Sequence, residues 1–153
     1  MDHDDTDNDA DTRDTRDTRD VRARVLADFE GRWRIERRIT QHDGPPARFD
    51  GQAVWSPEGD ALRYVERGEL RIEGQRAMQA ERRYLWRADL SVWFEDGQFF
   101  HLVPPGGGDA AHWCAPDAYD VSYDFALWPR FRVVWRVRGP RKDYTMTSTY
   151  APL

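Results

Sequence analysis

A strict alternation of apolar and polar residues is the feature that most constrains the fold of this chain. It begins at Gly31 and continues, with short interruptions, to Tyr150. In GRWRIERRIT, for example, Trp33 and Ile35 fall on one side of an extended chain and arginines fall on the other. Because successive side chains of a β-strand leave on opposite faces, this period predicts half-buried strands. No alternation of strands with long helices is visible, which argues against a parallel α/β fold.

Turn sequences divide the alternation into separate strands. The clearest is Asp96-Gly97, a two-residue hairpin signal, because both residue types tolerate positive φ. Further breaks occur at residues 42–46, 56–60 and 104–108 and at Gly139-Pro140. The sequence therefore predicts an all-β domain of about 8–10 antiparallel strands. An up-and-down barrel is favoured, because closure removes the edges that an Arg-rich sheet would otherwise expose.

The N-terminal segment departs from this pattern. Residues 1–20 contain nine Asp and three Arg and end in the repeat DTRDTRDTRD, so they predict a disordered acidic tail. Within residues 21–30, Val21, Val25 and Phe29 recur at intervals of four, with Leu26 beside them, which predicts a short helix. A chain of 153 residues has material for one core, so residues 21–153 are expected to form a single barrel domain.

Charge and hydropathy exclude several functions. The tail carries a net charge of −6, whereas the rest of the chain has 20 basic and 19 acidic residues, interleaved. Such a body lacks the single-sign field of a nucleic-acid-binding protein. No apolar run is long enough for a membrane span, and no secretory signal is visible. We expect a cytoplasmic protein that binds neither nucleic acid nor membrane, and the sequence indicates no oligomeric state.

Short motifs carry a resemblance to a known class of barrels. The segment FEGRW at residues 29–33 resembles the G-x-W signature that opens the first strand of lipocalins and their calycin relatives. Over residues 28–150 the chain is similar to an uncharacterised bacterial family of calycin-like proteins, through segments such as RYLW, FEDG and WRVRGPRKDY. The resemblance implies a lipocalin-like barrel without an established activity. It also implies that Trp33 closes one barrel end against a basic side chain, namely Arg132, Arg136, Arg138 or Arg141.

Two charged residues fall on the apolar faces of their strands. Arg37 shares the side of Ile35, and Glu66 shares the side of Tyr64. A buried charge is costly unless it is paired and hydrogen-bonded. The pattern predicts either a salt bridge inside the barrel or a pair that orients a ligand, and in both cases an interior that is polar in one place.

The aromatic content points to the same interior. Seven Trp, six Tyr and seven Phe indicate either an unusually aromatic core or a cavity lined with rings. The leading interpretation is a barrel that binds a small, partly apolar ligand carrying an anionic or polar group. The candidate ligand-binding residues are Arg37, Tyr64, Glu66, Tyr84, Trp86, His101, His112, Tyr119, Tyr123, Trp135, Arg141, Lys142 and Tyr144.

Other interpretations stay open. His101 has the parity of Phe99 and Val103, and a histidine in such a place is usually only hydrogen-bonded. It could instead serve as a general base, or as an axial ligand in a haem-binding barrel like the nitrobindins. No haem-attachment pattern occurs, so no cofactor is predicted and haem is an outside alternative.

An enzyme on the same scaffold is the second hypothesis. It would be an isomerase or a hydrolase, with His101 or Glu66 as acid or base and Tyr64 or Tyr84 as proton donor. No motif identifies catalytic residues. A third hypothesis is a protein-interaction module with a packed core.

The single cysteine, Cys114, gives little chemistry. His112-x-Cys114 supplies only half of a zinc site, so no metal is predicted. Cys114 is expected to be a small buried apolar residue rather than a nucleophile. Asp117, after a proline, is expected to organise a turn.

A cluster of charges follows the Gly139-Pro140 turn. Arg141, Lys142 and Asp143 either form a solvated turn that locks closure of the barrel or make an anion clamp. In the clamp, Arg141 and Lys142 would hold a carboxylate or phosphate while Asp143 orients the arginine.

Overall fold

The computed structural model describes residues 23–153, which form ten antiparallel strands in one sheet. The acidic tail predicted for residues 1–20 lies outside the described residues. In chain order the strands are β1 (Gly31–Gln41), β2 (Ala47–Glu58), β3 (Ala61–Ile72), β4 (Met78–Trp86), β5 (Ser91–Phe94), β6 (Phe99–Leu102), β7 (Gly108–Cys114), β8 (Asp117–Asp124), β9 (Phe131–Arg138) and β10 (Asp143–Pro152).

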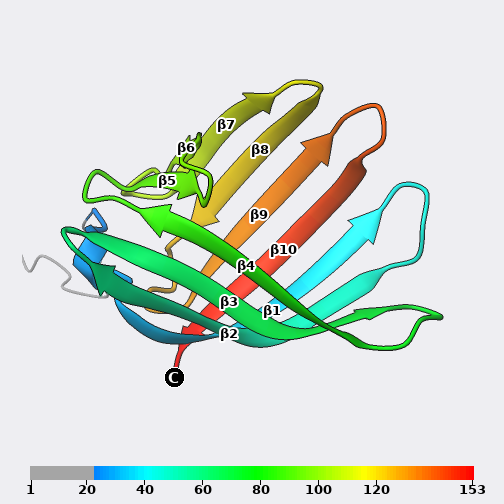
Figure 1. The fold of residues 1–153 in the computed structure, drawn as a ribbon, viewed down its shortest axis with the longest axis horizontal. Coiled ribbons are helices and arrows are strands. Elements are labelled where there is room, and N and C mark those ends of the chain that lie inside the picture. The colour runs from blue at the N-terminus through cyan, green and yellow to red at the C-terminus, as the bar shows by residue number, and fades with distance from the viewer. Residues whose placement is uncertain (1–22) are drawn as a thin grey trace, which may run out of the picture.

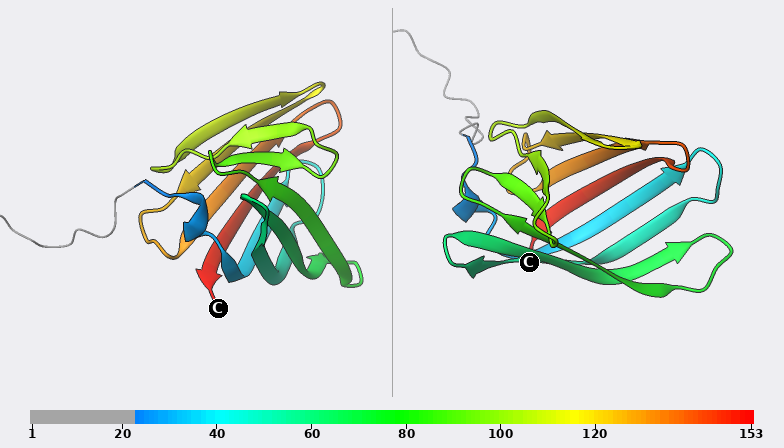
Figure 2. Two further views of the ribbon diagram at one scale, coloured as in Figure 1. Left: turned by 60° about the vertical axis from the view of Figure 1, so that its left-hand side comes forward. Right: turned by 45° about the horizontal axis from the view of Figure 1, so that its top comes forward.

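The sheet curls into a nearly closed barrel. Its strand order is β6-β5-β4-β3-β2-β1-β10-β9-β8-β7, so every neighbour is also a neighbour in sequence except at β1 and β10. These two join the halves of the chain through a ladder that runs from Trp33–Pro152 to Gln41–Tyr144. In Figure 1 the concave face lies between β4 and β7, and Figure 2 shows the sheet turning back on itself. Within residues 23–153, β6 and β7 form no ladder with each other, so the barrel has a seam there.

The prediction of an all-β antiparallel barrel is therefore confirmed, including its hairpins. Gly97 has a φ of +86°, as the Asp96-Gly97 turn requires. On the outer face the predicted interleaving of charges produces exposed ion pairs, such as Arg63 with Glu58 and Arg67 with Glu81. No helix within residues 23–153 is long and apolar enough to cross a membrane.

The short helix predicted within residues 21–30 is reduced to a single 3-10 turn. Among the described residues of this segment, only Leu26–Asp28 form a 3-10 turn, η1. The carboxylate of Asp28 accepts a hydrogen bond from the Val25 amide at 2.9 Å and closes this single turn. Val25 is 58% exposed while Phe29 is fully buried, so residues four apart do not share a buried face. The chain instead turns into β1 at Gly31, whose φ is +125°.

Next to the turn η1, the ring of Phe29 and the rings around it close the narrow end of the barrel. We call this cluster the aromatic plug. Phe29 packs against Trp86, Trp128 and Phe131 with ring centroids 5.0–5.7 Å apart. Trp33 belongs to the same cluster, and its indole N–H donates to the Phe29 carbonyl at 2.8 Å. Such tilted and edge-on ring pairs are favourable packing arrangements. The inner positions of the strands therefore form a continuous aromatic core at this end.

The basic partner expected for Trp33 is not found among Arg132, Arg136, Arg138 and Arg141. Trp33 packs against the rings of Trp55, Trp128 and Phe131. The guanidinium that closes this end is that of Arg24, which stacks over Trp128 at 4.4 Å. The arginines of β9 do not reach Trp33 because they lie on the outer face of the strand. Arg132, Arg136 and Arg138 alternate there with the inward-facing Val133 and Val137.

Candidate functional site

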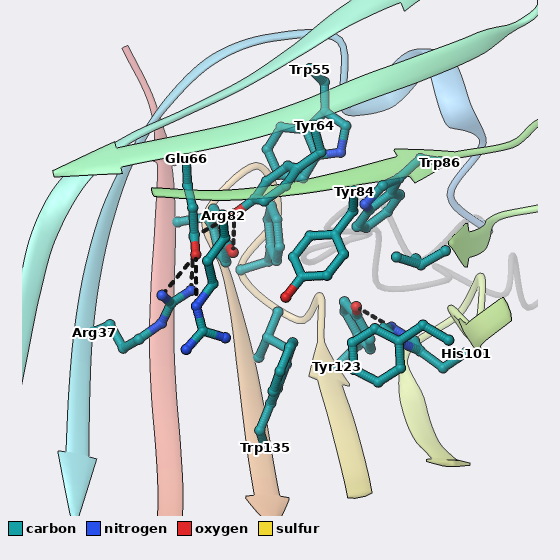
Figure 3. Close-up of a pocket in the computed structure, with 15 residues that line it drawn as sticks. Arg37, Trp55, Tyr64, Glu66, Arg82, Tyr84, Trp86, His101, Tyr123 and Trp135 are labelled. Atoms are coloured by element: carbon teal, nitrogen blue, oxygen red, sulfur yellow. Dashed lines mark hydrogen bonds and ion pairs between the residues drawn. The ribbon is translucent and has the colours of Figure 1, made fainter. Parts of the chain in front are cut away.

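A small chamber lies inside the barrel next to the aromatic plug (Figure 3). Its free volume is about 30 Å³, room for about one or two water molecules. Strands β1 to β6 and β8 to β10 all contribute side chains to its wall. The lining residues are Arg37, Trp55, Tyr64, Glu66, Arg82, Tyr84, Trp86, Val92, Phe100, His101, Tyr123, Phe131, Val133, Trp135 and Tyr150.

A buried ion pair forms one side of the chamber. Both Nη atoms of Arg37 donate to the carboxylate of Glu66 at 2.9 Å, and Arg37 Nε donates to Ser148 Oγ at 2.8 Å. The two side chains are 6% and 1% exposed. Burial acts to lower the pKa of Arg37, but the adjacent Glu66 carboxylate raises it above its usual value, so the guanidinium stays charged. Of the two interpretations from the sequence, the salt bridge inside the barrel is present.

Two tyrosines extend this network. Tyr64 donates its hydroxyl proton to Glu66 Oε2 at 2.7 Å, and Tyr150 OH lies 2.9 Å from Tyr64 OH. Because the only proton of Tyr64 goes to a carboxylate that can only accept, Tyr150 donates to Tyr64. Burial, followed by the charge of Glu66, raises the pKa of both phenols, so both stay neutral. Glu66 thus receives three hydrogen bonds, two from Arg37 and one from Tyr64.

A histidine and a tyrosine meet on the opposite side of the chamber. His101 Nε2 lies 2.8 Å from Tyr123 OH, which connects β6 to β8 across the seam. Burial, with a smaller effect of His112, lowers the pKa of His101 to about 3. Burial raises the pKa of Tyr123. Both groups are neutral near pH 7, and His101 Nδ1 has no hydrogen-bond partner among the described residues.

The alternating sequence pattern predicted the wrong buried neighbour for His101. Phe99, expected to share its face, is 45% exposed, and Phe100 is buried instead. The register shifts between Val92 and Trp93 on the partner strand, and this bulge places Phe100 and His101 both inside. A bulge of this kind has no reliable signal in a single sequence.

Arg82 is one of the chamber residues that were not among the candidates from the sequence. It lies on the inner face of β4 with Tyr84 and Trp86, which were selected, and parity alone could have identified it. Its side chain is 36% exposed, and its Nε lies 3.6 Å from Glu66 Oε1. The guanidinium carbon lies 5.5 Å from the centre of the Trp135 ring. Tyr150 and Ser148 also belong to the site and were not selected.

Three other candidates lie toward the wide end of the barrel, outside the chamber lining. His112, Tyr119 and Tyr144 are half-buried inner-face residues of β7, β8 and β10. The rings of His112 and Tyr119 lie 5.5 and 5.8 Å from Phe100, which separates them from the chamber. They could contact only a ligand that extends toward the wide end.

The structure does not bring Arg141 and Lys142 to the chamber. The β9–β10 ladder ends at Arg138–Asp143, so residues 139–142 project beyond the sheet. Lys142 Nζ lies 3.1 Å from the Asp117 carboxylate, and this pair raises the pKa of the lysine. Asp143 pairs with Arg136 rather than with Arg141. The cluster is a salt-bridged turn, and the expectation that Asp143 orients Arg141 is wrong.

Cys114 also differs from expectation, because it is exposed at the end of β7 instead of buried. Strand β7 extends past the core at this point, so a side chain on its inner side is not covered by other residues. Within residues 23–153 no three His, Cys, Asp or Glu side chains converge in a way that could hold a metal ion.

The geometry gives little support to acid–base chemistry at Glu66 or His101. Glu66 is fully engaged, and a histidine whose pKa is near 3 is a weak base at neutral pH. A haem would require His101 Nε2 to leave Tyr123 and the walls of the chamber to separate widely. Neither alternative draws support from the arrangement of the described residues.

Comparison with known proteins places this barrel among similar folds. The structure of the S-type phycobiliprotein lyase CPES from Guillardia theta matches with a TM-score of 0.60 over 84% of this chain and 90% of that chain. The sequence identity is 8%, so the likeness is one of fold. No curated protein matches the sequence. A family model matches residues 29–152, nearly the whole barrel. The chain therefore belongs to a family of unknown function, DUF6314.

Proposed function

We propose that this protein binds a small, partly apolar molecule carrying a polar or anionic group inside its barrel. The observation that carries the proposal is the buried ion pair between Arg37 and Glu66. This pair lines a chamber whose other walls are mostly aromatic rings. A core that served stability alone would gain little from this pair, because apolar residues of similar volume are often as stable or more so. Polar groups set among apolar walls are instead typical of ligand sites.

The wide end of the barrel gives a ligand its path to the chamber. Inner-face residues near the plug are buried, whereas those at the other end, such as Tyr144 and Trp135, are half-buried and Met78 is 43% exposed. The free volume of about 30 Å³ is smaller than a ring-containing ligand, so binding requires side chains or a strand to move aside. The lyase barrel supports the proposal at the level of fold only.

The test compares two substitutions at neighbouring positions. Val133→Phe adds a ring on the chamber side of β9, and Val134→Phe adds the same ring on the outer face. Wild-type protein and Val134→Phe, purified and extracted with organic solvent, are expected to release the same small molecule, identified by mass spectrometry, and Val133→Phe is expected to release much less. Equal retention by all three proteins, or retention by none together with no binding of added aromatic probes, would overturn the proposal.

A further inference from the structure

Among the residues that the structure describes, Arg82 has no carboxylate of its own, because Glu66 is already paired with Arg37. The residues lining the chamber include two arginines and one carboxylate, that of Glu66. Arg37 takes both oxygens of Glu66 in a bidentate pair, while Arg82 approaches one of them only through Nε at 3.6 Å. The neighbouring tyrosines are neutral, because burial raises their pKa values. The described lining therefore has one unit of excess positive charge.

The surroundings of this guanidinium suit an anion. Figure 3 shows Arg82 between Glu66 and Trp135, with the hydroxyl of Tyr84 pointing toward the same space. Arg82 Nη2 has the sulfur of Met146 as its neighbour at 3.7 Å, a weak acceptor that a carboxylate could replace. The ring of Trp135 offers a flat apolar surface beside it. An arginine fork next to a phenol O–H matches the two oxygens of a carboxylate.

Building on the proposed function, we infer that the ligand is an aromatic monocarboxylate and that Arg82 binds its carboxylate. The ligand anion completes a second ion pair beside Arg37–Glu66 and brings the lining to neutrality. Its apolar body lies among the rings of Trp135, Tyr84 and Phe100. One carboxylate suffices, because a second would introduce an unbalanced negative charge into the same enclosed space.

Matched pairs of probes that differ only in charge test this inference. Benzoate and benzamide, and 2-naphthoate and 2-naphthamide, have the same ring and nearly the same shape. Binding to the full-length protein is followed by the intrinsic tryptophan fluorescence and by ligand-observed NMR. The carboxylates are expected to bind about tenfold or more tightly than the amides, and added salt is expected to weaken only the carboxylates.

Substitutions on β4 assign the effect to one residue. Arg82→Gln is expected to weaken binding of the carboxylates much more than binding of the amides and so to remove the preference, and Arg82→Lys is expected to retain part of it. Arg83→Gln is the matched control, since Arg83 follows directly on the outer face and pairs with Glu81. Thermal unfolding of each variant checks that the barrel is intact, which Arg82→Gln should permit because Glu66 keeps Arg37.

The outcomes separate this inference from the proposed function. If amide and carboxylate bind equally to the wild type, or if Arg82→Gln keeps the preference, the assignment of Arg82 is wrong although the barrel still binds small molecules. If neither member of either pair binds and no molecule is retained on purification, both the inference and the proposed function fail.

Discussion

Arg37 and Glu66 are individually unfavourable in a barrel interior and acceptable only together. Their ion pair is nearly inaccessible to water, Ser148 Oγ accepts a further hydrogen bond from Arg37 Nε, and Tyr64 donates one to Glu66. Removing one member of such a pair leaves an uncompensated buried charge, which is far more costly than removing both. The network therefore has a clear signature in a double-mutant cycle.

Arg37→Met is expected to destabilise the protein by about 3–5 kcal/mol, and Glu66→Met by a similar amount. The double variant is expected to lose much less than the sum of the two, because neither member of the pair is left buried without the other. The free energy of unfolding is measured in urea from tryptophan fluorescence. The exposed pair Arg48 and Asp50 is the control, with losses below about 1 kcal/mol and little coupling. Additive losses at Arg37 and Glu66 would contradict this account.

His101 makes stability depend on pH. Its pKa is lowered from 6.5 to about 3 by burial, so between these values the unfolded chain binds a proton that the folded protein does not. Above pH 6.5 the histidine does not change the free energy of unfolding. As the pH falls from 6.5 to about 3, the free energy of unfolding decreases by up to about 1.4 kcal/mol per pH unit.

His101→Gln is expected to reduce the loss of stability between about pH 7 and about pH 5, because glutamine does not titrate there. Urea unfolding at the two pH values measures the difference. His42→Gln is the control, since His42 is exposed in the β1–β2 turn. A pH dependence unchanged by His101→Gln would show that the histidine is hydrated or charged in the folded protein.

Among the elements, the β5–β6 hairpin is attached most weakly. β5 pairs with β4 only from Tyr84–Phe94 to Trp86–Val92, whereas β2 and β3 pair along their whole length. β6 has no strand on its other side within the described part of the chain. Within residues 23–153, one direct side-chain hydrogen bond, His101 to Tyr123, connects this hairpin to β8. The hairpin is therefore the wall of the chamber that can move aside at least cost.

Hydrogen exchange followed by mass spectrometry should detect this difference. Peptides covering residues 91–102 are expected to exchange at least about tenfold faster than peptides from β2 and β3, because local opening breaks fewer hydrogen bonds. Tyr123→Phe, which removes the connection to His101, is expected to accelerate exchange in the hairpin and leave β2 unchanged. Equal protection of the hairpin and β2 would exclude it as the mobile wall.

The β2–β3 ladder depends on two glycines that face each other, Gly51 and Gly68. A Cβ atom at Gly68 would fall onto the carbonyl oxygen of Asp50, which is backbone and cannot give way. Gly68→Ala is expected to cost about 1–3 kcal/mol or more in unfolding free energy, measured by urea denaturation. Gly106→Ala is the control, because its Cβ would meet open space. Equal effects at both positions would argue against this close approach.

For the molecule as a whole, Phe29 connects the turn η1 to both halves of the sheet. Its ring contacts Trp55 and Trp86 on one side and Phe125 and Phe131 on the other. Phe29→Ala is expected to lower stability by about 3–5 kcal/mol through the cavity it leaves, seen as a large decrease in Tm. Leu127→Ala, at an exposed position, is expected to change it by about 0.5 kcal/mol or less. A small effect of Phe29→Ala would mean that the plug contributes little to closure.

The sequence by itself determined that the fold is an antiparallel all-β barrel of about 8–10 strands, and the side on which many of their residues lie. It placed Arg37, Glu66 and rings such as Tyr64 and Tyr84 inside, because side-chain alternation is a local property of an extended chain. It failed where a bulge shifted the register at Phe99 and where β7 left the core at Cys114. The helix that it predicted is reduced to one turn because burial of Phe29 in the plug outweighed a short periodic pattern.

Only the tertiary structure decided which inward groups meet. Arg37 bonds Ser148 across 111 positions of the chain, and His101 meets Tyr123 across the seam between β6 and β7. The same closure brings Arg82 to within 3.6 Å of Glu66, which is already paired with Arg37, and Lys142 to Asp117, outside the chamber. These contacts depend on the register between β1 and β10 and on the curvature of the sheet, which long-range packing sets and a local period of two does not contain.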